Sequence, residues 1–267
     1  MKTVKELMSL DNRVAIVTGG AGHIGSVFCE TLAEIGASVA VLDLNPEKCV
    51  QVAERIAIRS GNKAYPLSVD LANEKQIQMI PEKVLAQFGR IDILVNCAAF
   101  VGTSDLNGWA MPFSEQSAET WRMALEINLT AVFVLIQKCV EPMKKSGKGS
   151  IVNVGSIYGI VGPDLDLYEG TNMGNPAAYA ASKGGLLQFT KWLSTVLAPE
   201  IRVNAITPGG VWRNQPDSFL NKYIGKTPLQ RMATEEELKG ALAYLSSDLS
   251  AYVTGQNLVV DGGFTIW

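Results

Sequence analysis

Short apolar segments rich in β-branched residues alternate along the chain with longer segments whose apolar residues recur at helical spacing. The apolar segments span 14–18, 38–43, 63–70, 92–98, 150–156, 201–207 and 257–263. Most of them are apolar nearly throughout, which is typical of strands that are covered on both faces. The alternation therefore predicts an α/β fold with a doubly wound parallel sheet of about seven strands and helices on both faces.

Helix boundaries are also readable. Between the first two predicted strands, one stripe of apolar residues at helical spacing ends at Gly36, and near the C-terminus Thr234 and Glu237 stand at capping-box spacing. The chain shows no internal repeat, low-complexity linker or break in composition. We therefore expect residues 1–267 to form a single domain.

Two connecting segments are longer than the others. Residues 157–177 join the fifth predicted strand to a helix, and residues 209–233 join the sixth predicted strand to the next helix. Loops of this length in a compact domain are usually lids or binding loops. Both follow the carboxyl end of a strand, which is the edge where open α/β sheets bind ligands.

Composition excludes several classes of partner. With a net charge of −3 over 267 residues, the chain has no basic field for nucleic acid. Its four cysteines form no CxxC pair and it has one histidine, so we expect no metal site. No apolar run approaches the length needed to span a membrane, and no leader is recognisable in the sequence, so we expect a cytoplasmic protein without membrane contact.

The first candidate for chemistry is the sequence TGGAGHIG at 18–25, which lies between a predicted strand and a predicted helix. Gly19 permits a tight turn, Gly22 a close approach of the backbone, and Gly25 the packing of helix on strand. The free amides at the helix N-terminus then face a pyrophosphate. This context predicts a Rossmann-like dinucleotide site. We expect His23 at the helix entrance, near solvent or the phosphates, without a catalytic role.

Asp43 ends the second predicted strand, eighteen residues after Gly25. A carboxylate there accepts hydrogen bonds from the adenosine ribose and repels a 2′-phosphate. No arginine or lysine stands among the three residues that follow. We therefore expect NAD rather than NADP. The alternative is that Asp43 only caps the next helix.

The second candidate for chemistry is the pair Tyr179 and Lys183, which lie at i and i+4 on one face of a predicted helix. A nearby ammonium favours phenolate, so the pair predicts a tyrosine with a lowered pKa that exchanges protons near neutral pH. Ser156 ends the fifth predicted strand at the cofactor edge. Asn128 lies in an otherwise core-like helix, where a buried amide needs a partner.

Together these residues resemble the short-chain dehydrogenase/reductase family of the classical type, over nearly the whole chain. The matching elements are TGGAGHIG, Asp70–Leu71, NCAA at 96–99, Asn128, Ser156, Tyr179 with Lys183, PGG at 208–210 and VDGG at 260–263. The resemblance implies hydride transfer between the cofactor and a secondary alcohol or ketone. It also implies one domain that both binds the dinucleotide and carries the catalysis.

The resemblance further implies roles for individual residues. Tyr179 would be the general acid/base, Ser156 would orient the substrate oxygen, Lys183 would bind the nicotinamide ribose, and Asn128 would hold a water of the proton relay. Cofactor contacts are expected from Gly19, Gly22, His23, Ile24, Gly25, Asp43, Asp70, Leu71, Asn96, Ala98, Tyr179, Lys183, Pro208, Gly209 and Val211. Family members are commonly tetramers, so we expect a homotetramer or homodimer.

Three features depart from the family pattern. His23 stands where the middle glycine is expected, Ala99 replaces a glycine, and the distance from Ser156 to Tyr179 is longer than usual. None of them removes a catalytic group, but the insertion should reshape the substrate pocket. With Tyr168, Glu169, Trp212 and Arg213 nearby, it favours a small polar substrate such as a sugar, polyol or nucleotide-sugar derivative.

We expect substrate contacts from Ser156, Tyr168, Tyr179 and Trp212. The ending GGFTIW and the acidic insertion also resemble reductases encoded with bacterial surface-sugar pathways. The alternatives are a 3-oxoacyl thioester reductase, which normally uses NADPH, and an epimerase or dehydratase of the extended branch, which usually has a larger C-terminal domain. A dinucleotide-sensing protein without catalysis is a further alternative.

Overall fold

One parallel sheet of seven strands organises the chain, in the order β3-β2-β1-β4-β5-β6-β7. The computed structural model describes residues 1–101 and 106–267. The strands are β1 (Val14–Thr18), β2 (Ser38–Asp43), β3 (Ala64–Ser68), β4 (Ile93–Asn96), β5 (Gly149–Val154), β6 (Ile201–Pro208) and β7 (Asn257–Val260). The predicted Rossmann-like α/β fold is confirmed, and each predicted apolar segment overlaps one strand of the sheet.

Helices occupy the segments between the strands. The α-helices are α1 (Val4–Met8), α2 (His23–Glu34), α3 (Pro46–Ser60), α4 (Glu74–Phe88), α5 (Ala118–Leu125), α6 (Ala131–Ser146), α7 (Ala177–Leu197), α8 (Asp217–Lys226) and α9 (Lys239–Ser246). Short 3₁₀ turns are η1 (Phe113–Glu115), η3 (Ile157–Gly159), η4 (Leu165–Tyr168), η5 (Glu235–Leu238) and η6 (Asp248–Ser250), and a π-helical turn η2 (Glu126–Thr130) joins α5 to α6.

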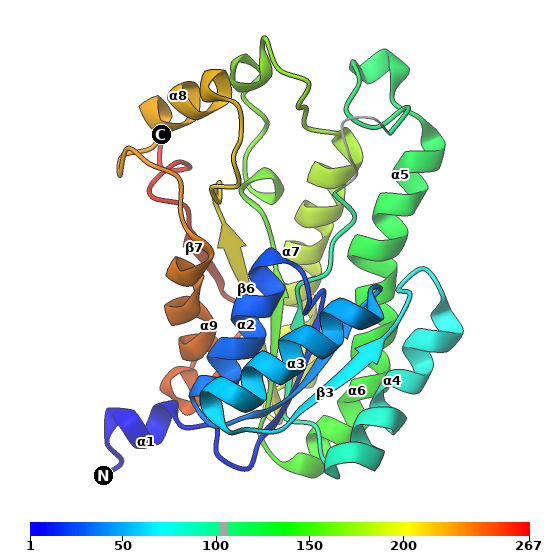
Figure 1. The fold of residues 1–267 in the computed structure, drawn as a ribbon, viewed down its shortest axis with the longest axis vertical. Coiled ribbons are helices and arrows are strands. Elements are labelled where there is room, and N and C mark those ends of the chain that lie inside the picture. Colours follow the sequence, from blue (N-terminus) through cyan, green and yellow to red (C-terminus); the bar gives the residue numbers. More distant parts are fainter. Residues whose placement is uncertain (102–105) are drawn as a thin grey trace.

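Two apolar cores cover the two faces of the sheet. Alternate side chains of a strand point to opposite faces, so Val14 and Ile16 of β1 pack with α4, α6 and α7, whereas Ala15 and Val17 pack with α2, α3 and α9. Figure 1 shows α2 and α3 in front of the sheet and α6 and α7 behind it. Burial on both faces explains why these strands are apolar nearly throughout.

Local sequence sets the ends of the helices around the sheet. The side chains of Asn45 and Asn73 accept hydrogen bonds from the third helical amides of α3 and α4. Both helices end at a glycine in the left-handed conformation, Gly61 with φ +71° and Gly89 with φ +78°. These caps fix the points where the chain returns to the sheet.

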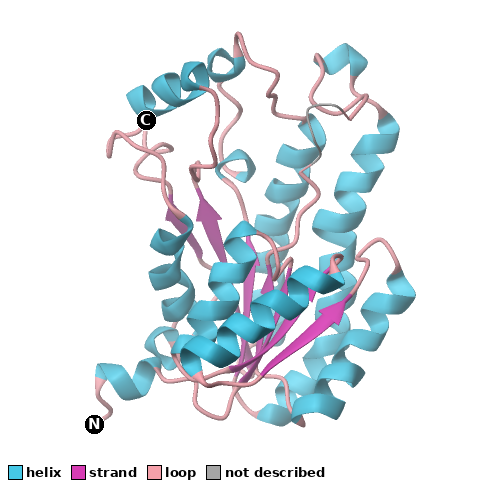
Figure 2. Cartoon of the chain, in the orientation of Figure 1, coloured by secondary structure: helices cyan, strands magenta, loops and turns pink. Residues whose placement is uncertain are grey.

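The longest connections stand above the carboxyl ends of the strands (Figures 1 and 2). Residues 157–177 are not irregular throughout, because they contain the turns η3 and η4. Residues 209–233 were expected to be a connection without a helix, and this expectation is wrong. They contain the ten-residue helix α8, whose buried Phe219 and Tyr223 pack with residues of the preceding connection.

One sequence expectation about membranes needs correction. The continuous helical segment Ala118–Ser146, formed by α5, η2 and α6, is long and apolar enough to cross a membrane by length and composition. Its most apolar window is 44% buried within the protein. Residues of α6 pack in the core against α4 and the sheet, which accounts for the apolar composition of the segment.

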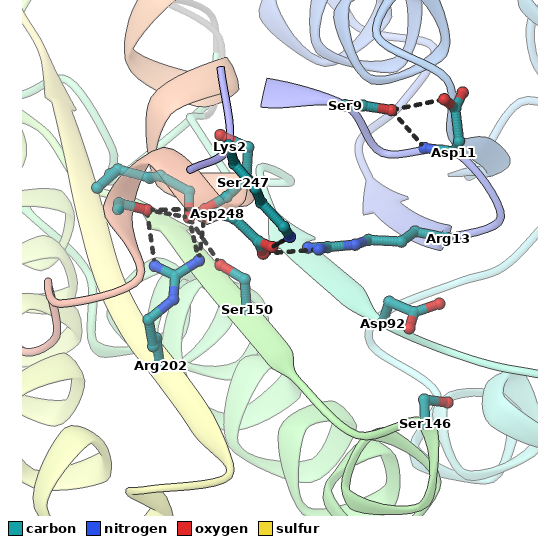
Figure 3. Close-up of polar contacts among 12 residues, drawn as sticks. Lys2, Ser9, Asp11, Arg13, Asp92, Ser146, Ser150, Arg202, Ser247 and Asp248 are labelled. Atoms are coloured by element: carbon teal, nitrogen blue, oxygen red, sulfur yellow. Dashed lines mark hydrogen bonds and ion pairs between the residues drawn. The ribbon is translucent and has the colours of Figure 1, made fainter. Parts of the chain in front are cut away.

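The opposite edge of the sheet is tied together by ion pairs and hydrogen bonds. Arg13 forms an ion pair with Asp248 at 2.6 Å, and Lys2 lies 3.6 Å from the same carboxylate (Figure 3). Arg202 donates to the carbonyl oxygens of Leu245 and Ser247 at 3.0 and 3.1 Å. These contacts anchor the segment before β7 far from the carboxyl edge, where the site lies.

Candidate active site

A cleft of about 570 Å³ lies at the carboxyl ends of the strands. It lies over the ends of β1 and β4, where successive crossovers run in opposite directions, the usual ligand position in such sheets. Fifteen of the residues named from the sequence line it: Gly19, Gly22, His23, Ile24, Gly25, Asp43, Asp70, Leu71, Ala98, Ser156, Tyr179, Lys183, Pro208, Gly209 and Val211.

The glycine-rich loop forms one wall of the cleft, and two of its glycines have a steric reason. Gly19 has φ +64°, and a Cβ there would lie 2.8 Å from the Cα of Ala98. A Cβ at Gly25 would overlap the carbonyl oxygen of Gly19. Larger residues at these positions would separate α2 from the loop or close the cleft.

The N-terminus of α2 opens into the same cleft. Its first amides precede any intrahelical acceptor, so they are available to an anion. Gly22 occupies the N-cap without a side-chain hydrogen bond. His23 begins the helix with 71% of its side chain exposed, as expected at the helix entrance. The loop and the amides fit the pyrophosphate of a dinucleotide.

Asp43 lies at the end of β2, on the floor of the cleft. One carboxylate oxygen accepts a hydrogen bond from the amide of Ala21 at 3.2 Å, and the other lies 3.4 Å from the amide of Asn45. The cap of α3 is Asn45, which accepts from Lys48 at 2.9 Å. Asp43 is therefore not the helix cap, and its carboxylate links the glycine loop to the end of β2.

Tyr179 and Lys183 lie on the first turns of α7 and both line the cleft. The Lys183 ammonium lies 5.8 Å from the centre of the Tyr179 ring. It donates a hydrogen bond to the carbonyl oxygen of Val154 at 2.7 Å. Lys183 is 2% exposed, so this bond compensates for part of the cost of burying the charge.

The electrostatics of this pair differ from the sequence expectation. Burial raises the pKa of Tyr179, although a hydrogen bond from Ser156 and the charge of Arg213 lower it. Burial lowers the pKa of Lys183 to about 8. The expectation of a phenol pKa lowered by Lys183 is therefore wrong for the protein alone, because burial raises that pKa and Lys183 is not among the groups that lower it.

Ser156 follows β5 by two residues and does not belong to the strand, which ends at Val154. Its side chain is 8% exposed and caps the turn η3, where Oγ accepts from the amide of Tyr158 at 3.3 Å. Ser156 and Tyr179 both line the cleft, and the Ser156 hydroxyl lies near enough to the phenol to act against the rise in its pKa. The two can therefore contact one substrate oxygen.

Asn128 is buried in the π-helical turn η2, and its amide makes hydrogen bonds at both ends. The oxygen accepts from the amide of Phe100 at 2.6 Å, and the nitrogen donates to the Phe100 carbonyl and to Ser182 Oγ at 3.2 and 3.0 Å. Among the described residues, the cleft lining includes Ile127 but not Asn128. Its side chain joins the segment after β4 to α7.

Asn96, expected at the adenosine ribose, points into the protein instead. Its nitrogen donates to Asn153 at 2.8 Å, and Asn153 donates to Thr190 at 2.9 Å. Its side-chain oxygen is buried without a partner in the described part of the chain. Asn96 is the last residue of β4, and strand alternation turns it away from the cleft, which Cys97 and Ala98 line.

Tyr168 and Trp212 were expected at the substrate, and neither lines the cleft in the described structure. Tyr168 Oη is hydrogen-bonded to Tyr158 Oη beneath the connection after β5. Both polar atoms of the Asn175 side chain are buried beside this pair. The amide acts to lower the pKa of both phenols, but it makes no hydrogen bond of full geometry within the described residues. Trp212 is 39% exposed.

Several lining residues were not predicted as site residues. Thr18 ends β1, and its Oγ accepts from the amides of Cys97 and Ala98 at 3.1 and 3.2 Å. Its position was readable, because it precedes the glycine loop at a predicted strand end. Arg213 and Gln215 also line the cleft. They follow PGG in a segment whose conformation no sequence pattern specified.

Comparisons with known proteins agree with this geometry. A family model described as enoyl-(acyl carrier protein) reductase matches residues 19–265. The chain is 37% identical over 263 residues to a cyclopentanol dehydrogenase of Comamonas testosteroni, covering 96% of this chain and 98% of that protein. It is 34% identical over 259 residues to a 3-oxoacyl-[acyl-carrier-protein] reductase of Chlamydia muridarum, covering 95% and 98%.

Solved structures share the same architecture. An NAD⁺-bound xylitol dehydrogenase aligns with a TM-score of 0.84 and 30% identity, over 95% of this chain and 99% of that one. A gluconate 5-dehydrogenase of Burkholderia cenocepacia, in complex with NADP and tartrate, aligns with a TM-score of 0.86 and 28% identity, over 99% and 100%. The relatives therefore act on different substrates, and the structures hold either NAD or NADP.

Proposed function

Because this chain belongs to the short-chain dehydrogenase/reductase family of the classical type, whose members act on CH–OH groups with NAD or NADP, we propose that it interconverts a secondary alcohol and a ketone with NAD(H). One observation carries the proposal. Ser156, Tyr179 and Lys183 line the same cleft as the glycine loop and Asp43. A reacting carbon above Tyr179 would thus lie within reach of a dinucleotide bound in that cleft.

Proton transfer is assigned to Tyr179. Its hydroxyl takes the proton of a substrate alcohol, or returns it to a ketone oxygen, while Ser156 holds that oxygen by a second hydrogen bond. The position of Lys183, fixed by Val154, places a positive charge near the phenol as negative charge develops there. Asn128 acts indirectly in this scheme, since it joins α7 to the segment at Phe100.

The dinucleotide would be held by the glycine loop, the N-terminus of α2, Asp43 and the residues around Ala98 and Pro208. When bound, its nicotinamide supplies or accepts the hydride. The preference for NAD rests on Asp43. Its carboxylate faces the cleft near the end of β2, and a 2′-phosphate would be repelled there. Among the described lining residues, the basic side chains are His23, Lys183 and Arg213, and none of them neighbours Asp43 in the chain.

For the substrate, we favour a small polar alcohol such as a polyol or sugar derivative. The Tyr158–Tyr168 pair and the unpartnered amide of Asn175 lie in the connection that follows Ser156. Buried groups of this kind discriminate strongly for a ligand that hydrogen-bonds to them. The likeness to a xylitol dehydrogenase supports the same class. None of the relatives named above is described as a surface-sugar reductase.

A small alicyclic alcohol is the second candidate. The aromatic rings of Phe219, Tyr223 and Phe264 stack near the same connection, with ring centres 5.8 and 4.7 Å apart. These rings are not among the described lining residues, but Ile127 and Val154 are, and an apolar ring can pack against them. The relative at 37% identity is a cyclopentanol dehydrogenase. A 3-oxoacyl thioester reductase is less favoured because Asp43 opposes the NADPH that such enzymes normally use.

The proposed assembly is a homotetramer or homodimer. Phe133 of α6 and Trp192 of α7 are 47% and 57% exposed, and Phe189 lies between them with ring centres at 6.0 and 6.2 Å. An exposed aromatic patch of this kind is typical of a protein interface.

A cytoplasmic location belongs to the proposal as well, since all four cysteines are free thiols.

Nicotinamide absorbance tests the function directly. The purified protein is mixed with NAD⁺ or NADP⁺ and a panel of xylitol, threitol, cyclopentanol and a 3-hydroxyacyl thioester. The proposal predicts reduction of NAD⁺ with a polyol or with cyclopentanol. Reduction confined to NADP⁺ with the thioester would contradict it, and cofactor binding without any reduction across a broad panel of alcohols would favour a sensing protein.

A further inference from the structure

Arg213, Glu235 and His23 lie close together beside the cleft, and Arg213 and Glu235 have no role in the chemistry above. Nε of Arg213 lies 3.2 Å from Oε1 of Glu235, and Nδ1 of His23 lies 4.0 Å from the same oxygen. Arg213 follows β6, Glu235 begins η5, and His23 begins α2. The Glu235 carboxylate therefore joins the segment after PGG to the helix that carries the glycine loop.

The backbone fixes where Arg213 and Glu235 stand. Val211 pairs with Ala233 in an isolated parallel bridge, in which the amide of Trp212 donates to the Ala233 carbonyl at 2.8 Å. Arg213 and Glu235 each follow their bridge residue by two positions. The bridge thus sets the two side chains beside each other, independently of the ion pair between them.

The turn that carries Arg213 is fixed as well. The Gln215 side chain accepts from the amide of Arg213 at 2.7 Å and donates to the Val211 carbonyl at 2.9 Å. Asn214 between them has φ +58°, a conformation that asparagine tolerates better than most residues. Arg213 and Gln215 both line the cleft. The guanidinium is therefore held at the cleft wall by a closed turn.

The free part of the guanidinium points to an anionic ligand. Glu235 accepts a hydrogen bond only from Nε of Arg213, and Nη1 and Nη2 make no hydrogen bond to the described residues. Such a fork matches two oxygens of a phosphate group. The charge also reaches the catalytic end, since it contributes to lowering the pKa values of Tyr179 and Cys97. Arg213 thus stands between the glycine loop and the catalytic tyrosine.

We propose that Arg213 binds the pyrophosphate of the dinucleotide through Nη1 and Nη2, opposite the amides of α2, and that Glu235 is a positioning residue that aims the guanidinium through Nε. This inference rests on the proposed function, because it takes the cleft to be a dinucleotide site. It assigns a cofactor contact to Arg213, which the sequence had placed only among the residues near the substrate.

Equilibrium binding tests the proposal without turnover. Kd values for ADP-ribose and NADH are measured by calorimetry for the wild type, Arg213→Gln, Glu235→Gln and the control Arg231→Gln. Arg231 pairs with Glu237 at 2.6 Å in the same region, and it is not among the residues that line the cleft in the described structure. Circular dichroism checks that every variant is folded.

We expect Arg213→Gln to raise the Kd for ADP-ribose and for NADH by about tenfold or more, because hydrogen bonds to charged groups are lost. The loss should shrink at high salt, as expected for a charge contact and not for a purely steric one. Glu235→Gln keeps an acceptor for Nε but loses the ion pair that aims the guanidinium, so it should weaken the binding of both ligands by less than Arg213→Gln does. Arg231→Gln should match the wild type.

Two results would overturn the assignment: a Kd for ADP-ribose within twofold of the wild type in Arg213→Gln, or equal losses in Arg213→Gln and Glu235→Gln. The second result would mean that the ion pair only holds the loop. A wild-type protein that binds neither ADP-ribose nor NADH would instead contradict the proposed function itself.

Discussion

Lys183 donates a hydrogen bond from its buried ammonium to the carbonyl oxygen of Val154, at 2.7 Å. The bond ties the helix that carries Tyr179 to the last residue of the interior strand β5. The proposed acid/base residue is therefore positioned by the sheet itself, through a lysine one helical turn away.

Burial of Lys183 predicts a particular dependence of stability on pH. Its pKa falls from 10.5 to about 8 in the folded protein. Below pH 8 the folded protein carries the full cost of the buried charge, and the cost disappears as pH rises from 8 to 10.5, because the folded state releases its proton first.

We therefore expect the melting temperature of the wild type, relative to Lys183→Met, to rise between pH 8 and pH 10.5. Calorimetry of both proteins without cofactor measures this difference, and other alkaline groups cancel because the two proteins share them. A difference in melting temperature that stays constant or falls over this range would show that burial does not lower the pKa of Lys183.

Replacing the acid at the end of β2 should relax cofactor choice. Asp43→Asn keeps a hydrogen-bond acceptor but removes the charge that opposes a 2′-phosphate. We expect discrimination between NADH and NADPH, measured as a ratio of Kd values, to fall by about tenfold or more. An unchanged ratio would mean that Asp43 holds the glycine loop through Ala21 but does not distinguish a 2′-hydroxyl from a 2′-phosphate.

The phenol pair predicts a difference between substrates. Tyr158→Phe removes one hydroxyl of the Tyr158–Tyr168 hydrogen bond and keeps the ring. KM for a polyol should rise by about fivefold or more, whereas KM for cyclopentanol should change by less than about twofold. Tyr252→Phe, at a fully exposed position, serves as the control. Equal changes for both substrates would indicate a structural role for the pair.

The aromatic patch on α6 and α7 predicts how the chain assembles. Trp192→Glu places a charge in the centre of an apolar interface and should shift the mass measured by light scattering toward a smaller species. Ile58→Glu changes a more exposed apolar residue on α3, which is 83% exposed, and should not shift the mass. If both variants keep the wild-type mass, the patch is not the interface.

Much of the fold was predictable because burial on both faces leaves a plain sequence signal. The bounds of β1 and β2 were predicted to the residue. For the other strands, the observed bounds differ from the predicted ones by at most three residues. Helix α8 was missed because it lies in a segment rich in proline and asparagine. Asn128 was correctly placed in a core-like helix, but the sequence did not show that α5, η2 and α6 form one continuous apolar helical segment.

Site residues were predictable where the residue type and its place beside a predicted strand or helix together indicate one chemical role. Gly19, Asp43, Tyr179 and Lys183 all line the cleft as expected. Orientation was not readable from sequence: Asn96 turns inward because of strand alternation. The raised pKa of Tyr179 depends on how deeply the chain buries it, which spacing alone does not specify.

The central claim is that Tyr179 transfers the proton in a cofactor-dependent oxidation or reduction. Tyr179→Phe keeps the ring and removes the hydroxyl group. In one stopped-flow experiment with the alcohol that the wild type oxidises, the change in nicotinamide absorbance and the binding of NADH are measured for both proteins. The account predicts that turnover falls by about a hundredfold or more while the Kd for NADH stays within about threefold. Turnover within tenfold of the wild type would contradict it.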